Sequence, residues 1–394
     1  MKIALLTTAF YPKINEALSI TIKQLGRQLT ILNHQVTIVS GRTNYRNVTK
    51  EIFEGIEIWR PYKVHGFPNN KLNIISVLKA CFSHITVQPA GLKLLIKKKH
   101  KNFDVIHGFS SSPLLVLRTI LAKTHSKSSI TIHTIKGKSI FQFTDWFSFL
   151  LNFVDKVTVA NNERKIRLVK FGCNSRKIKI IPSNIDIEKF TPLNKKILKK
   201  KYQYKCSLLL YYGHLTELKG ISYLIKSMKL VSEDVPKIKL LIIPSTSEKK
   251  YCSPYEKLIK QEKLNKYVKI IKNKVKIEEY VSLADIVVLP YPHLISTEGN
   301  PSCLLESMAC KTPVVTTDLP ELREIVTPDV DVLMAKPKNS EELAKKILKL
   351  LCDKKLQKRL SKSAFEKSKK FDVKKITEQY LKIYKELLKK SKNS

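Results

Sequence analysis

Short apolar runs rich in β-branched residues alternate with longer helical patterns along the whole chain. In the first half, the near-continuous apolar runs typical of buried parallel strands stand at 3–7, 35–40, 56–59, 104–107, 129–133, 156–160 and 177–181. Between them, helical periodicity is found at 17–32, 72–99, 113–124 and 162–170. This alternation predicts a doubly wound α/β sheet, in which ligands bind at the carboxyl ends of the strands.

The alternation pauses at 187–204, a stretch containing proline and many lysines, which we interpret as a linker. It then resumes with strands expected at 207–212, 238–243, 267–271, 285–289 and 313–316, and with helices expected at 219–231, 254–263 and from Pro301. Helices near 340–351 and 353–370 precede a last one after Asp372, in which apolar residues recur every three or four positions. The second half therefore predicts another doubly wound unit.

Length and composition exclude several classes of protein. The 394 residues suffice for two domains, and no apolar run approaches the roughly 20 residues that span a bilayer. The seven cysteines form no CxxC pair, which favours reduced thiols of a cytoplasmic protein over a disulfide framework or a zinc site. The start of the chain is too strand-like for a signal peptide.

The net charge of +40, from 73 basic and 33 acidic residues, favours an anionic partner. The lysines are spread along the whole chain, as a compositional bias would also produce. No aromatic-basic motif or nucleic-acid-binding module is present, so we expect no nucleic acid partner. An anionic membrane surface, which attracts basic residues by about 1 kcal/mol each, remains a candidate.

The most informative polar residues stand between 298 and 309. Glu298 lies in a Gly-Asn-Pro loop, and Glu306 follows eight positions later inside an apolar helical segment. Asn300 suits an N-cap and Pro301 the first helical position, so a helix should begin there. Its first backbone N–H groups could bind a diphosphate, with carboxylates nearby to hold sugar hydroxyls. The alternative is a surface-loop glutamate next to an unrelated helical one.

Five segments in the same order carry a resemblance along nearly the whole chain. They are Phe10-Tyr11-Pro12, Ile181-Pro182-Ser183-Asn184-Ile185-Asp186, Tyr212-Gly213-His214-Leu215-Thr216-Glu217-Leu218-Lys219-Gly220, the Glu298 and Glu306 pair with the strand after it, and Phe371-Asp372. Together they resemble the retaining glycosyltransferases of family 4, which have the GT-B fold. The resemblance implies two Rossmann-like domains facing across a cleft. The N-terminal acceptor-side domain would span 1–186, the linker 187–204 and the nucleotide-sugar-binding domain 205–371, and helix 372–394 would pack back on the first domain.

The resemblance also implies a chemistry, a retaining and metal-independent transfer of a hexosyl-type sugar. The sugar would pass from a UDP- or GDP-linked donor to a hydroxyl of a glycan or lipid-linked acceptor. Lys219 would supply a cation to the diphosphate, Glu306 would accept hydrogen bonds from the ribose hydroxyls, and Glu298 would contact the donor sugar near the reacting carbon. The other donor-binding residues expected are Gly213, His214, Gly299, Asn300, Pro301, Ser302, Cys303 and Leu304. No cofactor or metal is expected, since no DxD-like cluster follows a strand.

Two histidines end predicted strands of the first half, His107 and His133. The resemblance favours His133 as a catalytic residue close to the donor sugar, and the alternative is a hydrogen-bonded histidine at the sheet edge. The N-terminal loop Asn15-Glu16-Ala17 replaces the usual Gly-Gly, and His214 stands where the family usually has arginine, whose bidentate fork an imidazole cannot match. These departures leave a second hypothesis, a catalytically silent GT-B binding or scaffold subunit.

Two segments of the first half could contact lipid. The predicted helix 72–99 ends in Lys97-Lys98-Lys99-His100, and 141–153 is rich in phenylalanine and tryptophan. One hypothesis is an interfacial surface that receives a membrane-proximal acceptor, which would make the protein peripheral on the inner face of the cell membrane. The alternative is that the aromatic residues pack in the core and the lysines are a solvated helix end.

Overall fold

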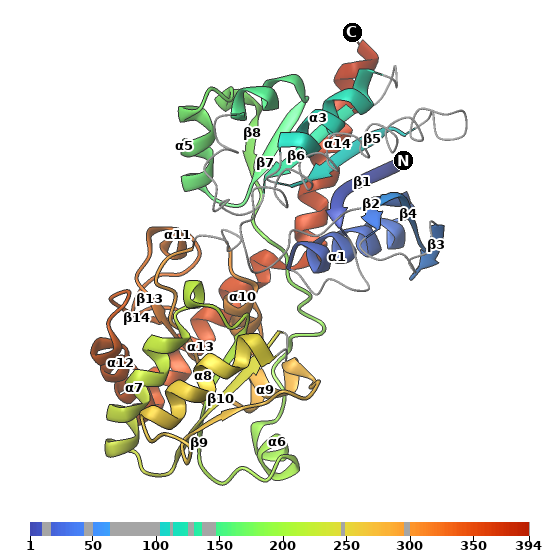
Figure 1. The fold of residues 1–394 in the computed structure, drawn as a ribbon. Coiled ribbons are helices and arrows are strands. Elements are labelled where there is room, and N and C mark those ends of the chain that lie inside the picture. Colours follow the sequence, from blue (N-terminus) through green and yellow to red (C-terminus); the bar gives the residue numbers. More distant parts are fainter. Residues whose placement is uncertain are drawn as a thin grey trace. The chain divides into compact units, whose positions relative to one another are not determined.

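The computed structural model describes residues 1–9, 17–42, 50–63, 103–110, 113–124, 130–135, 147–245, 249–294 and 300–393. The chain forms two compact units (Figure 1). Unit 1 comprises Met1–Pro182 and Val373–Ser394, and unit 2 comprises Ser183–Asp372. Each is built on a sheet of parallel strands with helices, so the predicted fold class of two doubly wound α/β domains is confirmed. The predicted helix 72–99 lies outside the described residues.

Unit 1 contains an eight-stranded sheet in the order β3-β4-β2-β1-β5-β6-β7-β8. Its strands are β1 (Lys2–Ala9), β2 (Gln35–Arg42), β3 (Lys50–Phe53), β4 (Ile56–Lys63), β5 (Val105–Phe109), β6 (Ile130–Ile135), β7 (Lys156–Val159) and β8 (Ile178–Ile180). Neighbours are parallel except β3 and β4. Glu54 and Gly55, both with positive φ, join these two strands in a tight hairpin.

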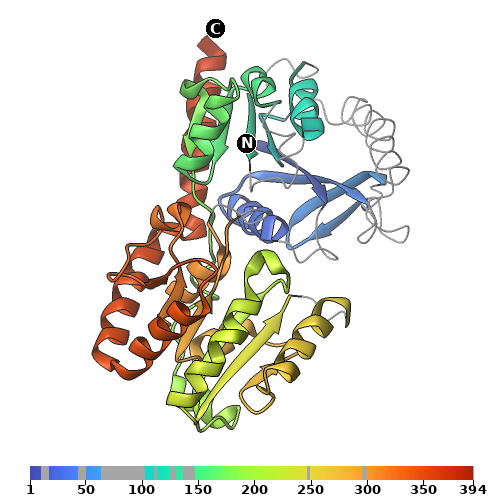
Figure 2. The ribbon, with the colours of Figure 1, turned by 60° about the vertical axis from the view of Figure 1, so that its left-hand side comes forward.

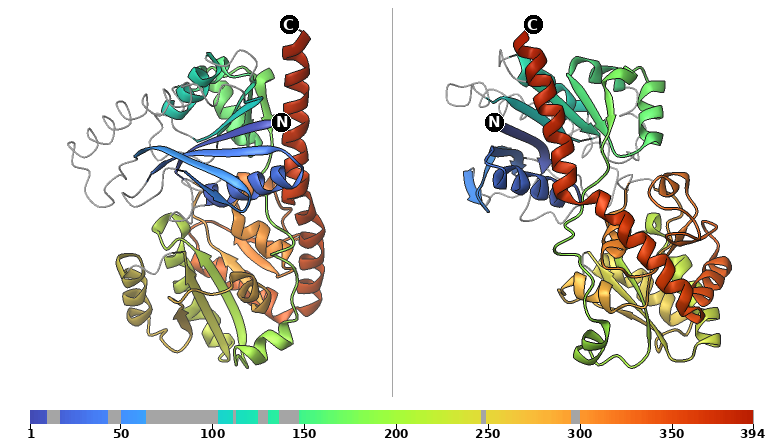
Figure 3. Two further views of the ribbon diagram at one scale, coloured as in Figure 1. Left: turned by 90° about the vertical axis from the view of Figure 1, so that its right-hand side faces the viewer. Right: turned by 180° about the vertical axis from the view of Figure 1, so that it is seen from behind.

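Helices cover both faces of this sheet. On one face, α1 (Ala17–Ile31) and α14 (Val373–Asn393) share a core with β1, β5 and β6, and Figure 3 shows α14 running past α1. The apolar stripe of α14 supplies Ile376, Tyr380 and Tyr384 to this core. On the other face lie α3 (Pro113–Thr124), the 3₁₀ helix η1 (Ser148–Phe153) and α5 (Asn162–Lys170), followed by the short turn η2 (Ser175–Lys177).

Unit 2 contains a six-stranded parallel sheet in the order β11-β10-β9-β12-β13-β14. The strands are β9 (Ser207–Gly213), β10 (Ile238–Pro244), β11 (Val268–Ile270), β12 (Ile286–Leu289), β13 (Val314–Thr317) and β14 (Leu333–Ala335). Helices α7 (Ile221–Asp234), α8 (Lys249–Gln261) and α12 (Ser340–Cys352) lie on one face, and Figure 2 shows the ribbon of this unit from a second side. Their side chains form one core with the strands. Those of α9 (Ile277–Leu283) and α10 (Ser302–Ala309) pack on the other.

The remaining helices of unit 2 are α6 (Lys195–Lys201), α11 (Pro320–Arg323) and α13 (Lys354–Ser368), with short turns η3 (Glu217–Lys219) and η4 (Lys369–Phe371). The stretch 187–204, predicted to be a linker, belongs to unit 2. Asn194 caps α6 by accepting hydrogen bonds from two backbone N–H groups, while Phe190 and Leu198 are buried in the core of the unit. Lys199 and Lys201 also anchor the stretch, through Asp285 and Glu279. The many lysines mask the apolar signal in the sequence.

Candidate functional site

Gly213 is the last residue of β9, a central strand of unit 2, and the loop that follows carries His214 and Lys219. Lys219 ends η3, and Gly220 follows it with a φ of +73°. A Cβ on Gly220 would lie 1.9 Å from the carbonyl oxygen of Pro290, just beyond β12. Only glycine therefore permits both the left-handed conformation and this close approach of two backbones.

Glu217 fixes the turn that carries Lys219. One of its carboxylate oxygens accepts a hydrogen bond from the Tyr255 hydroxyl of α8 at 3.2 Å, and the other accepts from Ser222 Oγ of α7 at 3.1 Å. The turn is thus tied to two helices, which limits the positions that the Lys219 ammonium can occupy. The sequence pattern alone predicts no individual role for these three residues.

His214 is exposed but has defined partners. Its Nδ1 lies 2.7 Å from Ser245 Oγ, and its carbonyl oxygen accepts a hydrogen bond from the Tyr211 hydroxyl at 2.8 Å. Partial burial of the ring, and then the nearby Lys219 ammonium, lower the pKa of His214 below its usual value of 6.5. The imidazole is therefore neutral at neutral pH, and it does not supply the permanent charge of the arginine that it replaces.

Helix α10 begins at Ser302, one residue later than predicted. Pro301 is the N-cap, with φ −59° and ψ 122°, and no side chain caps the helix. The prediction of Asn300 as the N-cap and Pro301 as the first helical residue was therefore wrong, because the Pro301 carbonyl already accepts the bonds of the first turn, from the N–H groups of Leu304 and Leu305. Asn300 is buried, and its Oδ1 has no hydrogen-bond partner within the described ranges. An uncapped first turn suits the binding of an anion.

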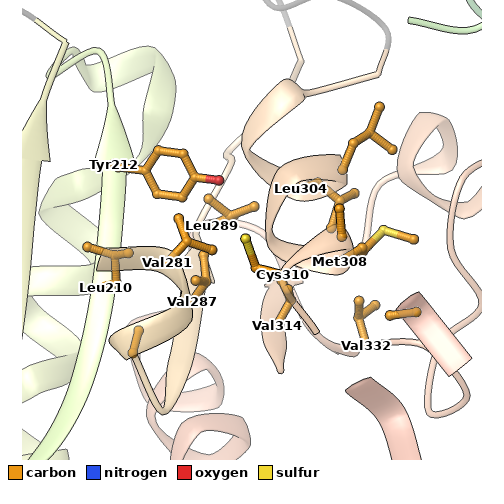
Figure 4. Close-up of a cluster of buried hydrophobic side chains, with 14 of the residues drawn as sticks. Leu210, Tyr212, Val281, Val287, Leu289, Leu304, Met308, Cys310, Val314 and Val332 are labelled. Atoms are coloured by element: carbon orange, nitrogen blue, oxygen red, sulfur yellow. The ribbon is translucent and has the colours of Figure 1, made fainter. Parts of the chain in front are cut away.

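Tyr212, the last tyrosine of β9, joins this strand to α10. Its hydroxyl donates a hydrogen bond to the Cys303 carbonyl at 2.8 Å and lies 3.3 Å from Ser307 Oγ, while Cys303 Sγ lies 3.3 Å from the Tyr212 carbonyl oxygen. Figure 4 shows the Tyr212 hydroxyl pointing toward α10 above the buried core, to which Leu304 contributes its side chain. The two segments that the sequence assigned to the diphosphate are therefore adjacent.

Lys219 lies beside the same helix. Its Nζ is 5.8 Å from the centre of the Tyr291 ring. Burial raises the pKa of the Cys303 thiol strongly, the charge of Glu306 raises it further, and Lys219 opposes both effects. An electrostatic influence of this kind requires both charged groups to be near Cys303. Lys219 and Glu306, which are 87 positions apart in the sequence, thus both lie near Cys303 in the first turn of α10.

Glu306 has an unusual protonation behaviour. Burial is the main cause that raises its pKa from 4.5 to about 7, against the lowering effects of the nearby Tyr212 hydroxyl and of the Lys189 ammonium. The charge of Glu278 adds a small further increase. Near neutral pH the carboxyl therefore exchanges between its protonated and ionised forms, and a ligand that donates two hydroxyls would favour the ionised form.

In unit 1, the two predicted histidines lie on opposite faces of the sheet. His133 is fully buried, its Nε2 donates to the Ser110 carbonyl at 3.0 Å, and its Nδ1 is 3.2 Å from Thr119 Oγ1. Burial lowers the pKa of His133 to about 4, so the ring is neutral. His107 faces α14, where its Nδ1 lies 2.7 Å from the hydroxyl of Tyr384. Both ring nitrogens of His133 have protein partners in this arrangement, and its catalytic role stays a prediction.

Most residues of two predicted loops lie outside the part of the chain that the structure describes. Glu298, Gly299, Asn15 and Glu16 lie outside the described residues, and Ala17 is the first residue of α1. Their roles remain predictions. Among the residues that the structure does describe, no group of three or more metal-ligating side chains is gathered, and no helix is both long and apolar enough to cross a bilayer.

Two family models match this chain in succession. Residues 18–189 match the model described as glycosyltransferase family 4, and residues 194–367 match glycosyl transferases group 1. The first match covers most of unit 1 and runs a few residues into unit 2, and the second contains the Lys219 turn and α10. The chain belongs to glycosyltransferase family 4. As a family 4 protein, it has the two parallel-sheet domains of the GT-B fold.

Individual relatives agree with this assignment. The N,N'-diacetylbacillosaminyl-diphospho-undecaprenol alpha-1,3-N-acetylgalactosaminyltransferase of Campylobacter jejuni is 26% identical over 256 residues, which are 63% of this chain and 65% of that relative. The chain spans less than two thirds of the length of the first curated relatives that it matches, 64% and 65%. Among solved structures, sucrose-phosphate synthase from Thermosynechococcus elongatus has a TM-score of 0.79 at 18% identity over 98% of both chains. HepE of Anabaena in complex with UDP has a TM-score of 0.75 at 14% identity, over 98% of this chain and 100% of that one.

Proposed function

We propose that this family 4 protein transfers a sugar from a nucleoside diphosphate sugar to a hydroxyl of a glycan or lipid-linked acceptor. The observation that supports the proposal is that Cys303, in the first turn of α10, is joined to Tyr212 of β9 and has both Lys219 and Glu306 nearby. A cation, an uncapped helix start and a carboxylate are the groups that a diphosphate and a ribose require.

Cleavage of the donor places negative charge on the leaving phosphate. The Lys219 ammonium would stabilise that charge from a turn that Glu217 ties to α7 and α8. The first N–H groups of α10 would add the positive end of the helix dipole. With these groups in place the reaction would need no metal. Donors that are already oriented in the resting protein stabilise the transition state without a reorganisation cost.

Glu306 would select the nucleotide through its ribose. In its ionised form the carboxylate would accept a hydrogen bond from each of two ribose hydroxyls, and Tyr212 would keep α10 at the correct distance from β9. Glu298 would contact the donor sugar, whose anomeric configuration the product would retain. A UDP donor is favoured over a GDP donor because HepE, which shares the fold, is in complex with UDP.

The name of the Campylobacter relative specifies a diphospho-undecaprenol acceptor. We extend that acceptor class to this chain and propose a lipid-linked acceptor, reached from the cytoplasmic side at an anionic membrane surface. The net charge of +40 supports this location, because such a surface attracts each nearby Lys or Arg by about 1 kcal/mol.

The experiment is incubation of the protein with a panel of UDP- and GDP-sugars, with release of free nucleotide as the readout. One donor should be turned over, and faster when lipid-linked acceptor extract is added. Glu306→Ala and Lys219→Ala should weaken nucleotide binding, whereas Glu298→Ala should lose transfer and keep most of the binding. Turnover by the Lys219→Ala and Glu306→Ala variants at the wild-type rate would contradict the assignment.

A second candidate function is that of a catalytically silent binding subunit, favoured by the neutral His214 beside Lys219. Such a protein would bind nucleotide sugars but release no nucleotide from any donor, even with acceptor extract present. His214→Arg separates the two candidates. It should accelerate turnover in a working enzyme by strengthening the hold on the leaving diphosphate, and in a silent subunit it should change only the affinity.

A further inference from the structure

The outer surface of one helical layer of unit 1 is unusually apolar. Fifteen large apolar side chains are exposed within the described residues, and seven of them belong to α3, η1 with the residue before it, and α5. They are Leu117, Leu121, Phe147, Phe149, Phe153, Ile166 and Val169. Every exposed phenylalanine of that set comes from η1 or its N-cap, and Phe153 is 61% exposed. The sequence had left open whether these aromatic residues pack in the core, and these three do not.

The elements that carry these side chains pack on one common core. Val116 of α3, Leu151 of η1 and Leu168 of α5 enter the same core against β7, so the opposite sides of the three elements all face outward. Asn152 ties η1 to the segment after α5, since its side chain donates to the Gly172 carbonyl at 2.8 Å and accepts from the Asn174 N–H at 2.7 Å. Figure 1 shows α3 and α5 beside β6, β7 and β8 of unit 1.

The same region is strongly basic. Between 147 and 181 there are eight basic residues and two acidic ones, Asp155 and Glu163. Lys170 and Arg176 are exposed. Arg164 is buried, and Lys156 and Lys179 project to the other face of the sheet, near Lys390 of α14. The basic residues are Lys156, Arg164, Lys165, Arg167, Lys170, Arg176, Lys177 and Lys179. A partner for this surface must therefore be apolar and anionic together.

A second copy of the chain does not meet this requirement, because it would bring another +40 to the contact. An anionic bilayer meets it, since the interface between headgroups and acyl chains accepts aromatic rings while the phosphates attract Lys and Arg. Asn152 ties η1 to the segment after α5, so the phenylalanines of η1 are held at the surface. This arrangement suits their insertion into the headgroup region of a bilayer.

We propose that the η1–α5 surface, formed by Phe147, Phe149, Phe153, Ile166 and Val169 with the basic residues around them, rests on an anionic phospholipid bilayer. This inference rests on the proposed function, because it names the face by which unit 1 would approach a lipid-linked acceptor. The interaction itself requires neither a donor nor an acceptor, so it can be measured separately.

The experiment is flotation of the full chain with phosphatidylcholine vesicles, with and without phosphatidylglycerol. The test variant carries Phe147→Ser, Phe149→Ser and Phe153→Ser. The matched control carries Leu193→Ser, Ile197→Ser and Val330→Ser, which remove three exposed apolar side chains from unit 2. The test variant should partition onto anionic vesicles about tenfold less than wild type, and the control should equal wild type. Lys170→Glu with Arg176→Glu should lower partitioning by at least about fivefold for each residue.

Circular dichroism and nucleotide binding by unit 2 would verify that both triple variants are folded. Flotation of the test variant at the wild-type level would overturn the inference, as would a wild-type chain that does not float with anionic vesicles. A wild-type dimer that the test variant dissociates would assign the surface to a second copy instead. Vesicle binding by a chain that turns over no donor would leave this inference standing and refute only the proposed reaction.

Discussion

Replacing Glu306 with glutamine should stabilise the protein at neutral and alkaline pH. Burial raises the pKa of this carboxyl from 4.5 to about 7, so the folded state holds the proton more tightly than the unfolded chain does. The contribution of Glu306 to stability is therefore most favourable below pH 4.5 and declines as the pH rises to about 7. Above that pH the ionised carboxylate costs the folded protein about 3 kcal/mol, as an upper value.

Glutamine keeps the size of the side chain and a neutral oxygen at its end, but it carries no charge. In urea denaturation, Glu306→Gln should be more stable than wild type by up to about 3 kcal/mol at about pH 8, and the two should converge at about pH 4. Calorimetric titration with UDP at about pH 8 should give the opposite order, with an affinity about tenfold to a hundredfold weaker, because the charged acceptor of the ribose hydroxyls is lost.

The control is Glu233→Gln, which removes an exposed carboxylate from α7 of the same unit. It should show no gain in stability that grows with pH. The reasoning fails if Glu306→Gln and wild type are equally stable at about pH 8, or if their difference is the same at both pH values, since either result would mean that the folded state does not retain the proton.

Three further changes test other parts of the structure. Lys219→Ala should weaken UDP binding by about tenfold to a hundredfold in calorimetry through loss of a charge-assisted contact, and Lys219→Arg should retain most of it; equal affinities would refute the assignment. Gly220→Ala should lower the free energy of unfolding by more than about 2 kcal/mol, because the added Cβ would lie 1.9 Å from the Pro290 carbonyl oxygen. An unchanged urea midpoint would contradict this close contact between the two backbones. Tyr384→Phe should cost about 1 to 3 kcal/mol by leaving His107 Nδ1 without its partner at 2.7 Å, whereas a smaller loss in urea would show that the bond contributes little.

The apolar runs of the sequence predicted most strands because these strands are buried on both faces, and burial leaves a strong signal. The β3 strand was missed since it lies at the sheet edge, where exposed and half-buried residues alternate over only four positions. Helix α8 starts at Lys249, ahead of the predicted start at 254, because Pro254 lies inside the helix rather than at its beginning.

Of the candidate site, the sequence predicted the residues that stand in recognisable motifs, but not their arrangement in space. Lys219 and Glu306 were predicted as site residues. That both lie near Cys303 depends on β9 and β12 being neighbours in the sheet, which no local sequence pattern encodes. Tyr212 has a role that the sequence could have suggested, since a tyrosine ends an aliphatic strand there. The pKa of Glu306 could not be anticipated, because it results from side chains that only the folded unit brings around the carboxyl.

Unit 2 is inserted within unit 1, because the chain leaves unit 1 at Pro182 and returns at Val373. The two crossing points adjoin, since the Ile185 N–H donates to the Phe371 carbonyl at 2.9 Å. During synthesis on the ribosome, unit 2 can complete its core while unit 1 still lacks α14. Nascent unit 1 therefore lacks the part of its core that α14 supplies, Ile376, Tyr380 and Tyr384, until α14 has emerged. A chaperone that delays collapse should assist this final step.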